Sequence, residues 1–446
     1  MARDRQSGPR LGTQIFAYTL TNIGTAFSWG YITSYFMMFC TDAVGISAAA
    51  CSVLLLVSRL FDGFTDSACG FWTDRRPTRW GRYRPWVLCC APLVVVCTCL
   101  LFSSNDQWPM WQKLLWAYVS YFLYLLAFTG FSVPLDSMAS VMSGDPADRA
   151  RIISWRSAAG IVGALIMTQI ATWYFAGHGT DQVESYFHLT LLFGCISLPL
   201  FLLTPLLCRE RIQPRGERQR HFSLREVVRQ NLHNRPFWIA VAGHFLNGLI
   251  TYGRVSIFVY YFKYVAGDMA LYATFTLLMR VPQIFGAWVG QHFLKLFRSP
   301  GRALAVLYLA YGLTLTVNFF VSPAQSLPAF WVLTVVSSFL FGMSYALIYI
   351  IIPDLVDYGE YLSGVRNDGG ISATLDFANK VGMAIGTSGM GFVLAALGFS
   401  ANMPQTPQVM WGINALMFIG PGVLSMGIGV LFLWYKLDRT VLHAGE

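Results

Sequence analysis

The sequence is short of charge, because Asp, Glu, Lys and Arg make up only 12% of its 446 residues. A soluble chain of this size needs more polar side chains to cover its surface, so the composition argues against a soluble globular protein. The chain also lacks the glycine-rich phosphate loop of nucleotide hydrolases and any evident nucleophile set beside a base. These absences argue against ATP-driven chemistry and against an enzyme.

Three further absences narrow the class of protein. No cleavable signal peptide is visible, because residues 1–10 are polar and the first apolar segment is long and has no small-residue cleavage site. The nine cysteines lie between Cys40 and Cys208 without a repeated metal-ligand spacing, so we expect packing residues rather than disulfides. The net charge of +9 forms no basic stripe interleaved with aromatics, which indicates no nucleic-acid partner.

Apolar residues are abundant, at 55% of the chain, and they recur in about twelve segments of bilayer-spanning length. The segments cover residues 13–40, 46–73, 86–104, 110–135, 152–176, 186–208, 237–263, 269–294, 303–321, 328–352, 371–399 and 408–435. A transmembrane helix needs roughly 20 predominantly apolar residues. The sequence therefore predicts an all-α, multi-pass membrane protein with twelve transmembrane helices.

Basic residues fall in alternate loops. They precede the first segment and follow the second, fourth, sixth, eighth and tenth, whereas the intervening loops offer almost only Lys113 and Lys263. Cytoplasmic loops are the ones enriched in Lys and Arg, so the pattern predicts that both termini lie in the cytoplasm. The first apolar segment then serves as its own insertion signal.

One long hydrophilic interval divides the chain into two blocks of six segments. We expect an N-terminal six-helix bundle over residues 1–208, a cytoplasmic linker over 209–236 and a C-terminal six-helix bundle over 237–446. Part of the linker, residues 223–231, has the composition of an amphipathic surface helix.

Two carboxylates lie inside the second apolar segment. Asp62 and Asp66 are four residues apart and share one helix face. Each costs roughly 2.5 to 3.5 kcal/mol at the centre of a bilayer, so the pair needs a compensating partner. Hard cations such as Na⁺ prefer oxygen ligands, and Thr65 adds a hydroxyl on the same helix. The pattern indicates a cation site. The alternative is an internal ion pair, with Arg59 neutralising Asp62 one turn away or another buried basic residue neutralising Asp66.

Three motifs extend this interpretation. The run Asp62-Gly63-Phe64-Thr65-Asp66, the arginine–tryptophan–glycine loop at residues 79–86 and the aspartate–tyrosine–glycine–glutamate run at 354–361 occur together. In this combination the chain resembles, over nearly its whole length, the glycoside-pentoside-hexuronide:cation symporter family of the major facilitator superfamily. The resemblance implies a sugar site at mid-membrane between two six-helix halves, and symport of a sugar with Na⁺, Li⁺ or H⁺ by alternating access, without another cofactor.

The resemblance also implies sugar-binding residues. Arg156 in the fifth segment and Lys380 in the eleventh match cationic residues that the family places at its sugar site. Long cationic side chains donate well to sugar hydroxyls. The alternative for each is a snorkelling or salt-bridged structural cation. Tyr345 stands where the family often has a tryptophan, and Trp29 is another aromatic candidate for stacking on a pyranose; most other aromatics are expected in the core or the interfacial belt.

Two positions depart from the melibiose carrier that typifies the family. That carrier has sugar-binding aspartates on its first and fourth helices, where this chain has Ala26 and Ser132. Loss of a buried acceptor changes specificity strongly, so the sugar is not expected to be melibiose. Replacement polar groups lie nearby and join Ser132 as candidates for the sugar site: Asp136, Asp376 and Arg254. Arg254 raises the positive charge and suits an anionic glycoside, although Asp136 and Asp376 offset it, and Asp376 alternatively neutralises Lys380.

Charged residues also cluster in the loops that are predicted to be cytoplasmic. They are expected to form salt bridges between the bundles that hold one conformation closed, although a role in loop folding is an alternative. The residues are Asp74, Arg75, Arg82, Asp354, Asp357 and Glu360.

Together these features predict a monomeric, cation-coupled sugar symporter of a bacterial inner membrane, with a sugar, a cation and membrane lipid as its partners. Two other functions are weighed against it. A lysolipid carrier needs an apolar cavity, against which Arg156, Lys380 and Asp136 argue. A non-transporting sugar sensor usually carries an added cytoplasmic signalling domain, and none is visible after Leu437.

Overall fold

The computed structural model describes residues 11–75, 78, 80–105, 107–143, 145–210, 227, 229, 231–232, 234–297, 299–321, 323–363 and 368–435. The regular elements in this part of the chain are helical, apart from an isolated bridge between Thr78 and Gly81. The chain forms two compact units, Met1–Glu217 and Arg218–Glu446.

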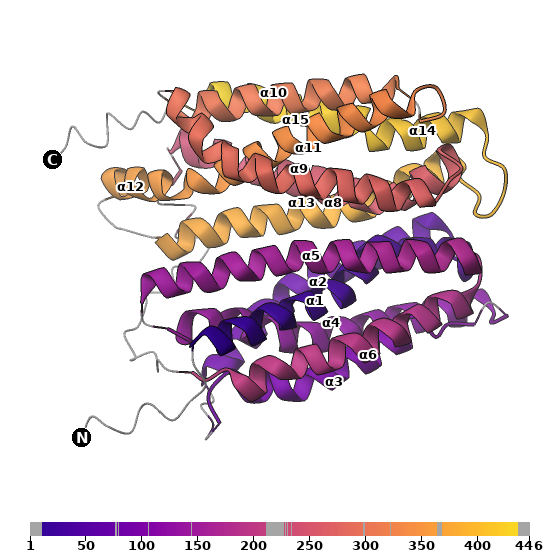
Figure 1. Ribbon diagram of the computed structural model, residues 1–446, viewed down its shortest axis with the longest axis horizontal. Helices are drawn as coiled ribbons and strands as arrows, with labels where there is room; N and C mark the ends of the chain where they lie inside the picture. The colour runs from indigo at the N-terminus through magenta and orange to yellow at the C-terminus, as the bar shows by residue number, and fades with distance from the viewer. Residues whose placement is uncertain are drawn as a thin grey trace. The chain divides into compact units, whose positions relative to one another are not determined.

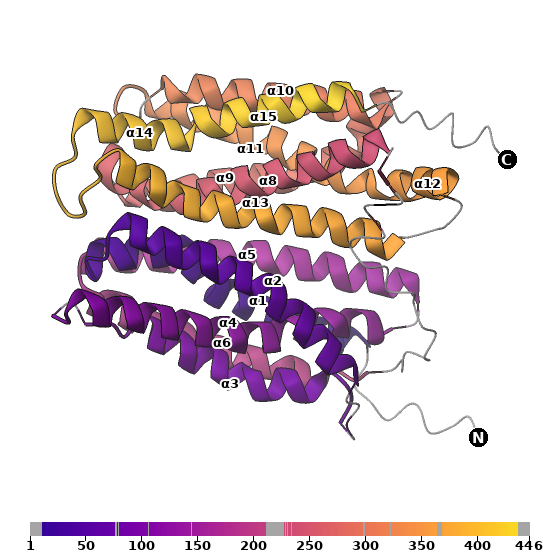
Figure 2. The ribbon, with the colours of Figure 1, turned by 180° about the vertical axis from the view of Figure 1, so that it is seen from behind.

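The first unit holds the helices shown in indigo to magenta in Figures 1 and 2. They are α1 (Leu11–Met38), α2 (Ala48–Arg75), α3 (Arg84–Leu101), α4 (Met110–Val141), α5 (Pro146–His178) and α6 (Val183–Leu207), with a π-helical turn at Phe39–Ala43 after α1. Helix α1 packs against α5 and α6, and α4 packs against α3 and α2. Side chains of α1, α2, α4 and α5 therefore meet within one bundle.

The second unit holds the helices coloured from rose to yellow. They are α8 (Arg235–Tyr260), α9 (Ala270–Phe293), α10 (Pro300–Phe319), α11 (Leu327–Ile350), α12 (Ile352–Ser363), α13 (Asp368–Ala396), α14 (Pro407–Met417) and α15 (Ile419–Leu433), with a π-helical turn at Tyr261–Val265 and a 3₁₀ turn at Leu294–Leu296. The main helix pairs are α8 with α13, α9 with α11, and α10 with α15.

All twelve predicted segments coincide with long helices or helix pairs, and most ends agree within a few residues. Two ends differ more. Helix α4 continues past residue 135 to Val141, and α5 starts at Pro146 rather than 152, because helical hydrogen bonding continues into polar sequence that an apolar window leaves out. The short helix α12 was not predicted as a separate element. Most of the predicted surface helix at 223–231 lies outside the described residues.

Seven helical stretches of the described chain are long and apolar enough to cross a membrane by length and composition. The other long helices, α1, α2, α8, α9 and α13, have 24 to 29 residues but do not meet the same test. Among them, α2 carries Asp62 and Asp66, and α13 carries Asp376 and Lys380. Two of the predicted functional pairs therefore lie on long helices that are less apolar than the other spans.

Glycines allow close approach of α8 and α13. A Cβ atom at Gly382 would collide with the carbonyl oxygen of Phe245, and one at Gly386 with that of Leu249. This agrees with the small-residue face that the sequence shows at Gly382 and Gly386, since small residues let helix backbones meet in membranes.

A carboxylate holds the loop between α2 and α3. Glu210, just after α6, accepts backbone N–H bonds from Arg82 and Tyr83 at 2.7 Å and from Arg84 at 3.1 Å. These are unpaired amides at the start of α3, where an anion is favoured. Gly81 has φ +118°, and a Cβ atom there would lie 2.5 Å from the carboxylate of Glu210. The positive φ of Gly81 favours glycine in the arginine–tryptophan–glycine loop, because side chains with a Cβ rarely adopt it.

We expect Gly382→Ala to lower the free energy of unfolding by about 1 to 3 kcal/mol, because the new methyl group meets rigid backbone of α8. Gly389→Ala on the same helix is the matched control, since nothing lies within 4 Å of its added Cβ. Thermal unfolding of the purified protein in detergent measures both. A Gly382→Ala protein as stable as the Gly389→Ala protein would contradict this view of the α8–α13 contact.

Candidate functional site

The two acidic residues of α2 meet a hydroxyl from α4. Thr129 Oγ1 lies 3.2 Å from Asp66 Oδ1 and 3.4 Å from Asp62 Oδ1, and both carboxylates are half-buried. A hydroxyl has one proton to donate, so it serves the two carboxylates alternately and keeps lone pairs for another partner. Oxygens from three side chains and two helices therefore converge at one place in the first unit.

Arg59 lies beside this acidic pair. Its Nη1 is 4.0 Å from Asp62 Oδ2, and its side chain is only 3% exposed. The guanidinium lies 4.4 Å from the ring centroid of Trp29, a cation–π contact. Nε and Nη1 have no hydrogen-bond partner among the described residues. Asp62 thus faces both the guanidinium of Arg59 and the hydroxyl of Thr129. The ion pair that was the alternative to a cation site is therefore present together with the converging oxygens.

Thr65 is arranged differently from Thr129. Its hydroxyl donates within its own helix, to the carbonyl of Asp62 at 3.0 Å and that of Phe61 at 3.3 Å. The sequence suggested Thr65 as an additional hydroxyl on the same helix, and it did not indicate Thr129. Thr129 lies 63 residues from Asp66 in an apolar run, so only the packing of α2 on α4 reveals the contact.

Trp29 is held inside the first unit. Besides the contact with Arg59, its ring stacks on that of Phe128, with centroids 4.9 Å apart and planes at 16°. Phe128 stacks in turn on Tyr124 at 5.6 Å. The contacts of Trp29 help to hold the Arg59 guanidinium in place. Stacking of Trp29 on a sugar stays a prediction.

Arg156 and Asp136 form an ion pair between α5 and α4. Neither is fully buried, with side-chain exposures of 33% and 50%. Tyr18 of α1 is close enough to interact electrostatically with both, and Ser132 is half-buried one turn before Asp136. The sequence identified Arg156 and Asp136 separately as sugar-site candidates; their pairing depends on the α4–α5 geometry and was not predicted.

Ala26 lies at the crossing of α1 and α5. A Cβ atom built on Gly163 would lie 2.8 Å from the Cβ of Ala26. The position where the resemblance implies an aspartate is therefore a tight helix contact in this chain.

In the second unit, Asp376 and Lys380 lie one turn apart on α13, and both are exposed. Asp376 interacts electrostatically with Lys380 and with Tyr345 and Tyr349 of α11. Tyr345 is 37% exposed, and its ring centroid lies 5.3 Å from that of Tyr349. The candidate sugar residues of α11 and α13 are therefore neighbours, and the predicted pairing of Asp376 with Lys380 is compatible with their spacing.

Arg254 has a clear structural role. It is buried, and its Nε donates to the carbonyl of Met417 at 3.1 Å while Nη1 donates to the Tyr311 hydroxyl at 2.9 Å. That carbonyl is free of a helical bond because the residue four positions on, Pro421, has no N–H. Arg254 thus supplies the hydrogen bond that the Met417 carbonyl lacks at the break between α14 and α15, at Phe418. A sugar contact by Arg254 stays a prediction.

The predicted gating residues are only partly described. Asp354, Asp357 and Glu360 lie on α12, which packs against α11 and α13. Asp74 and Arg75 end α2, and their side chains lie outside the described residues. Arg82 is held through its backbone N–H by Glu210. Salt bridges between the bundles stay a prediction.

Nowhere in the described residues do three or more His, Cys, Asp or Glu side chains gather in a way that could hold a metal ion. The site on α2 and α4 offers two carboxylates, which suits a weakly held monovalent cation or a proton better than a resident divalent metal.

A family model described as MFS/sugar transport protein matches residues 17–439. Among curated proteins, the chain is 30% identical over 431 residues to the putative glycoside/cation symporter YagG of Escherichia coli (strain K12), covering 96% of this chain and 92% of that protein. It is 28% identical over 428 residues to the isoprimeverose transporter of Lactiplantibacillus pentosus, with coverages of 95% and 88%. The glucuronide carrier protein homolog of Escherichia coli (strain K12) is 26% identical, with coverages of 95% and 93%.

Solved structures share the fold. A bacterial homolog of the human lysosomal transporter Spinster, in an inward-facing and occupied conformation, has a TM-score of 0.69 at 14% identity and covers 97% of both chains. The nucleoside transporter NupG has a TM-score of 0.65 at 15% identity, with 96% of this chain and 100% of that chain covered. At these identities the likeness shows the fold alone.

We expect Arg254→Gln to destabilise the second unit by about 2 to 4 kcal/mol, because the Met417 carbonyl and the Tyr311 hydroxyl lose a charged donor in a buried setting. Arg151→Gln, at an exposed arginine on α5, is the control and should change stability by less than about 0.5 kcal/mol. Thermal unfolding of the two variants tests this, and equal unfolding temperatures would rule out the structural role of Arg254.

Proposed function

The chain belongs to the MFS/sugar transport protein family, within the glycoside-pentoside-hexuronide:cation symporters, and we propose that it carries a neutral glycoside or pentoside with Na⁺ or H⁺ by alternating access. It is an integral, multi-pass membrane protein and a cation-coupled sugar transporter rather than an enzyme. The names of its relatives support a glycoside as the substrate, since one is an isoprimeverose transporter and another a putative glycoside/cation symporter.

The coupling cation binds at Asp62, Asp66 and Thr129 in this proposal. The observation that carries it is the Thr129 hydroxyl, which reaches both carboxylates from a second helix. Carboxylate and hydroxyl oxygens are the ligands that hard cations prefer, and a carboxylate pair also takes up a proton readily. The same residues therefore fit either ion.

Arg59 sets the charge that the cation must balance. Two carboxylates on one helix face repel each other, and the guanidinium 4.0 Å from Asp62 offsets one of the two charges. One negative charge remains, which matches a single monovalent cation. Binding of this cation removes the remaining repulsion and joins α2 to α4 through Thr129.

Each unit by itself offers the sugar groups that accept and donate hydrogen bonds. In the first unit, Arg156 donates and Asp136 accepts, and their ion pair leaves this region without net charge. In the second unit, Lys380 and Asp376 offer the same combination beside Tyr345. Paired opposite charges favour hydroxyl-rich neutral sugars, and they weaken the hypothesis of an anionic glycoside. Ser132 and Trp29 remain secondary candidates.

Coupling follows from reciprocity. If the cation tightens sugar binding by some factor, the sugar tightens cation binding by the same factor. Uptake of labelled glycosides, pentosides and uronides into membrane vesicles tests the proposal, with an imposed sodium gradient, a proton gradient or neither. Accumulation of one neutral sugar under one gradient is the expected result. Accumulation of none, or of a uronide alone, would contradict it.

We expect Thr129→Val to raise the cation concentration needed for half-maximal uptake by about tenfold, because one oxygen ligand worth roughly 1 to 2 kcal/mol is lost. Thr65→Val should leave this concentration within about twofold, since the Thr65 hydroxyl bonds carbonyls of its own helix. Uptake titrated against the coupling ion compares the two. The opposite ranking would return the ligand role to Thr65.

We expect Asp62→Asn to abolish gradient-driven accumulation while some sugar exchange persists, because the cation site loses charge and the sugar residues are elsewhere. The acidic pair then keeps one carboxylate, which the charge of Arg59 offsets, so no net negative charge is left to attract a cation. Counterflow in vesicles preloaded with sugar measures the exchange. Unchanged ion dependence in this variant would reject the assignment of Asp62.

A further inference from the structure

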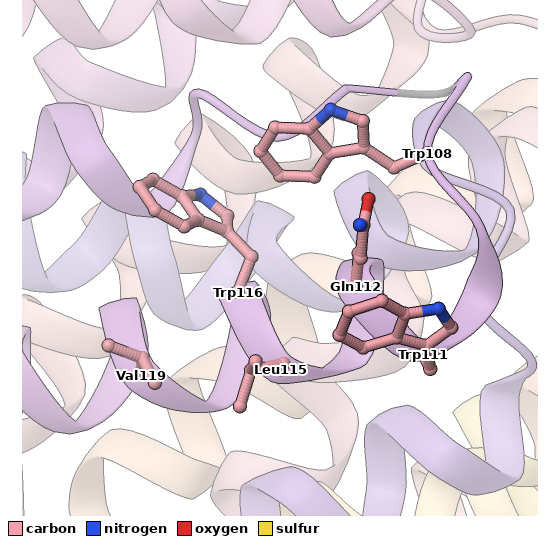
Figure 3. A pocket seen from close by; sticks show the side chains of 6 residues that line it. All are labelled: Trp108, Trp111, Gln112, Leu115, Trp116 and Val119. Carbon is pink, nitrogen blue, oxygen red and sulfur yellow. The ribbon is translucent and has the colours of Figure 1, made fainter.

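An apolar groove lies at the start of α4, apart from the acidic site. Figure 3 shows its lining side chains, which come from α4 and the loop before it. They are Trp108, Trp111, Gln112, Leu115, Trp116 and Val119. Its volume of about 460 Å³ is in the range of small-molecule pockets, roughly 300 to 1,000 Å³. A groove lined by three indole rings is suited to a ligand with a large apolar part.

Two of the three indoles of this groove are held by contacts within the first unit. The indole N–H of Trp116 donates to the carbonyl of Leu100 at the end of α3, at 3.1 Å. The rings of Trp108 and Trp116 meet edge to face, with centroids 5.7 Å apart and planes at 78°. These two rings lose little conformational entropy when a ligand binds, so this part of the groove is preorganised.

Hydrogen-bond donors remain available at its mouth. The indole N–H groups of Trp108 and Trp111 and the side-chain amide of Gln112 have no protein partner in the described part of the chain. The neighbouring Lys113 is engaged, because its ammonium donates to the carbonyl of Val44 at 2.7 Å. The groove therefore offers neutral donors and no charge of its own.

An exposed apolar stripe continues from the groove along α4. Leu115, Val119, Leu123 and Leu126 are 56%, 46%, 45% and 50% exposed. From Trp111 to Leu126 the helix rises about 22 Å, at 1.5 Å per residue. One leaflet of a bilayer has a hydrocarbon depth of about 15 Å, so the stripe spans it. Between residues 102 and 113 the sequence has a single basic residue, Lys113, so the positive-inside rule places the start of α4 at the outer face.

We propose that this groove is a specific site for one glycerophospholipid of the outer leaflet. The acyl chain lies along the stripe on α4, and Trp111 and Trp108 cover its upper end. The ester carbonyls and phosphate oxygens accept hydrogen bonds from the Gln112 amide and the free indole N–H groups. Since the lining is uncharged, the site takes zwitterionic and anionic headgroups alike. This goes beyond an aromatic belt, which positions a helix without retaining any one lipid.

Native mass spectrometry of the full chain tests the site, after exchange into vesicles of phosphatidylethanolamine and phosphatidylglycerol and graded removal of lipid. One lipid per chain should persist in the unmodified protein, with less than threefold preference between the two headgroups. Trp111→Ala should lower its occupancy at least fivefold. Gln112→Ala, a polar substitution with little risk to folding, should lower it about threefold.

Trp173→Ala is the matched control, since Trp173 of α5 is 78% exposed and lies outside the groove lining. It should keep the lipid. Equal occupancy in all four proteins would overturn the proposal. So would a soluble glycoside that shields indole fluorescence from acrylamide in the unmodified protein but not in Trp111→Ala, because the groove would then bind sugar.

Discussion

The structure depends on one electrostatic constraint, which is that charges inside apolar helices must be balanced locally. Asp62 and Asp66 would be costly in a spanning helix without nearby partners. The Arg59 guanidinium lies 4.0 Å from the Asp62 carboxylate, and the Thr129 hydroxyl is shared between the two carboxylates. One charge is left over. In the proposed function, a cation that neutralises this remaining charge would stabilise the contact between α2 and α4.

The same constraint shapes the other polar groups. Arg156 is balanced by Asp136, and Asp376 lies beside Lys380. Arg254 instead supplies hydrogen bonds to a helix break that Pro421 creates, so its charge serves the fold. The helices that carry these groups differ in apolar composition. Helices α4 and α5, with Asp136 and Arg156, are apolar enough to cross a membrane by the same test as α3 and α6, whereas α8 and α13, with Arg254 and Asp376, are not.

The sequence was sufficient to predict twelve spans, the two six-helix blocks and the acidic pair, because these depend on local periodicity and on residues four apart. It did not predict Thr129, the pairing of Arg156 with Asp136, or the role of Glu210 at the start of α3. Each of these contacts joins residues at least 20 positions apart. They depend on how the helices pack, and helix packing cannot be read from a single sequence. The helix break at Phe418 could have been predicted from Pro421. The hydrogen-bond donor at this break could not, because Arg254 lies 163 residues from Met417.

The most direct test of the central claim is equilibrium binding of the transported glycoside to the purified protein, titrated with Na⁺ at fixed pH and with pH in the absence of Na⁺. The unmodified protein and the double variant Asp62→Asn, Asp66→Asn are compared. We predict that one of the two titrations tightens sugar binding in the unmodified protein, and that neither does so in the double variant, which still binds sugar. A double variant that keeps the same ion dependence would contradict the account.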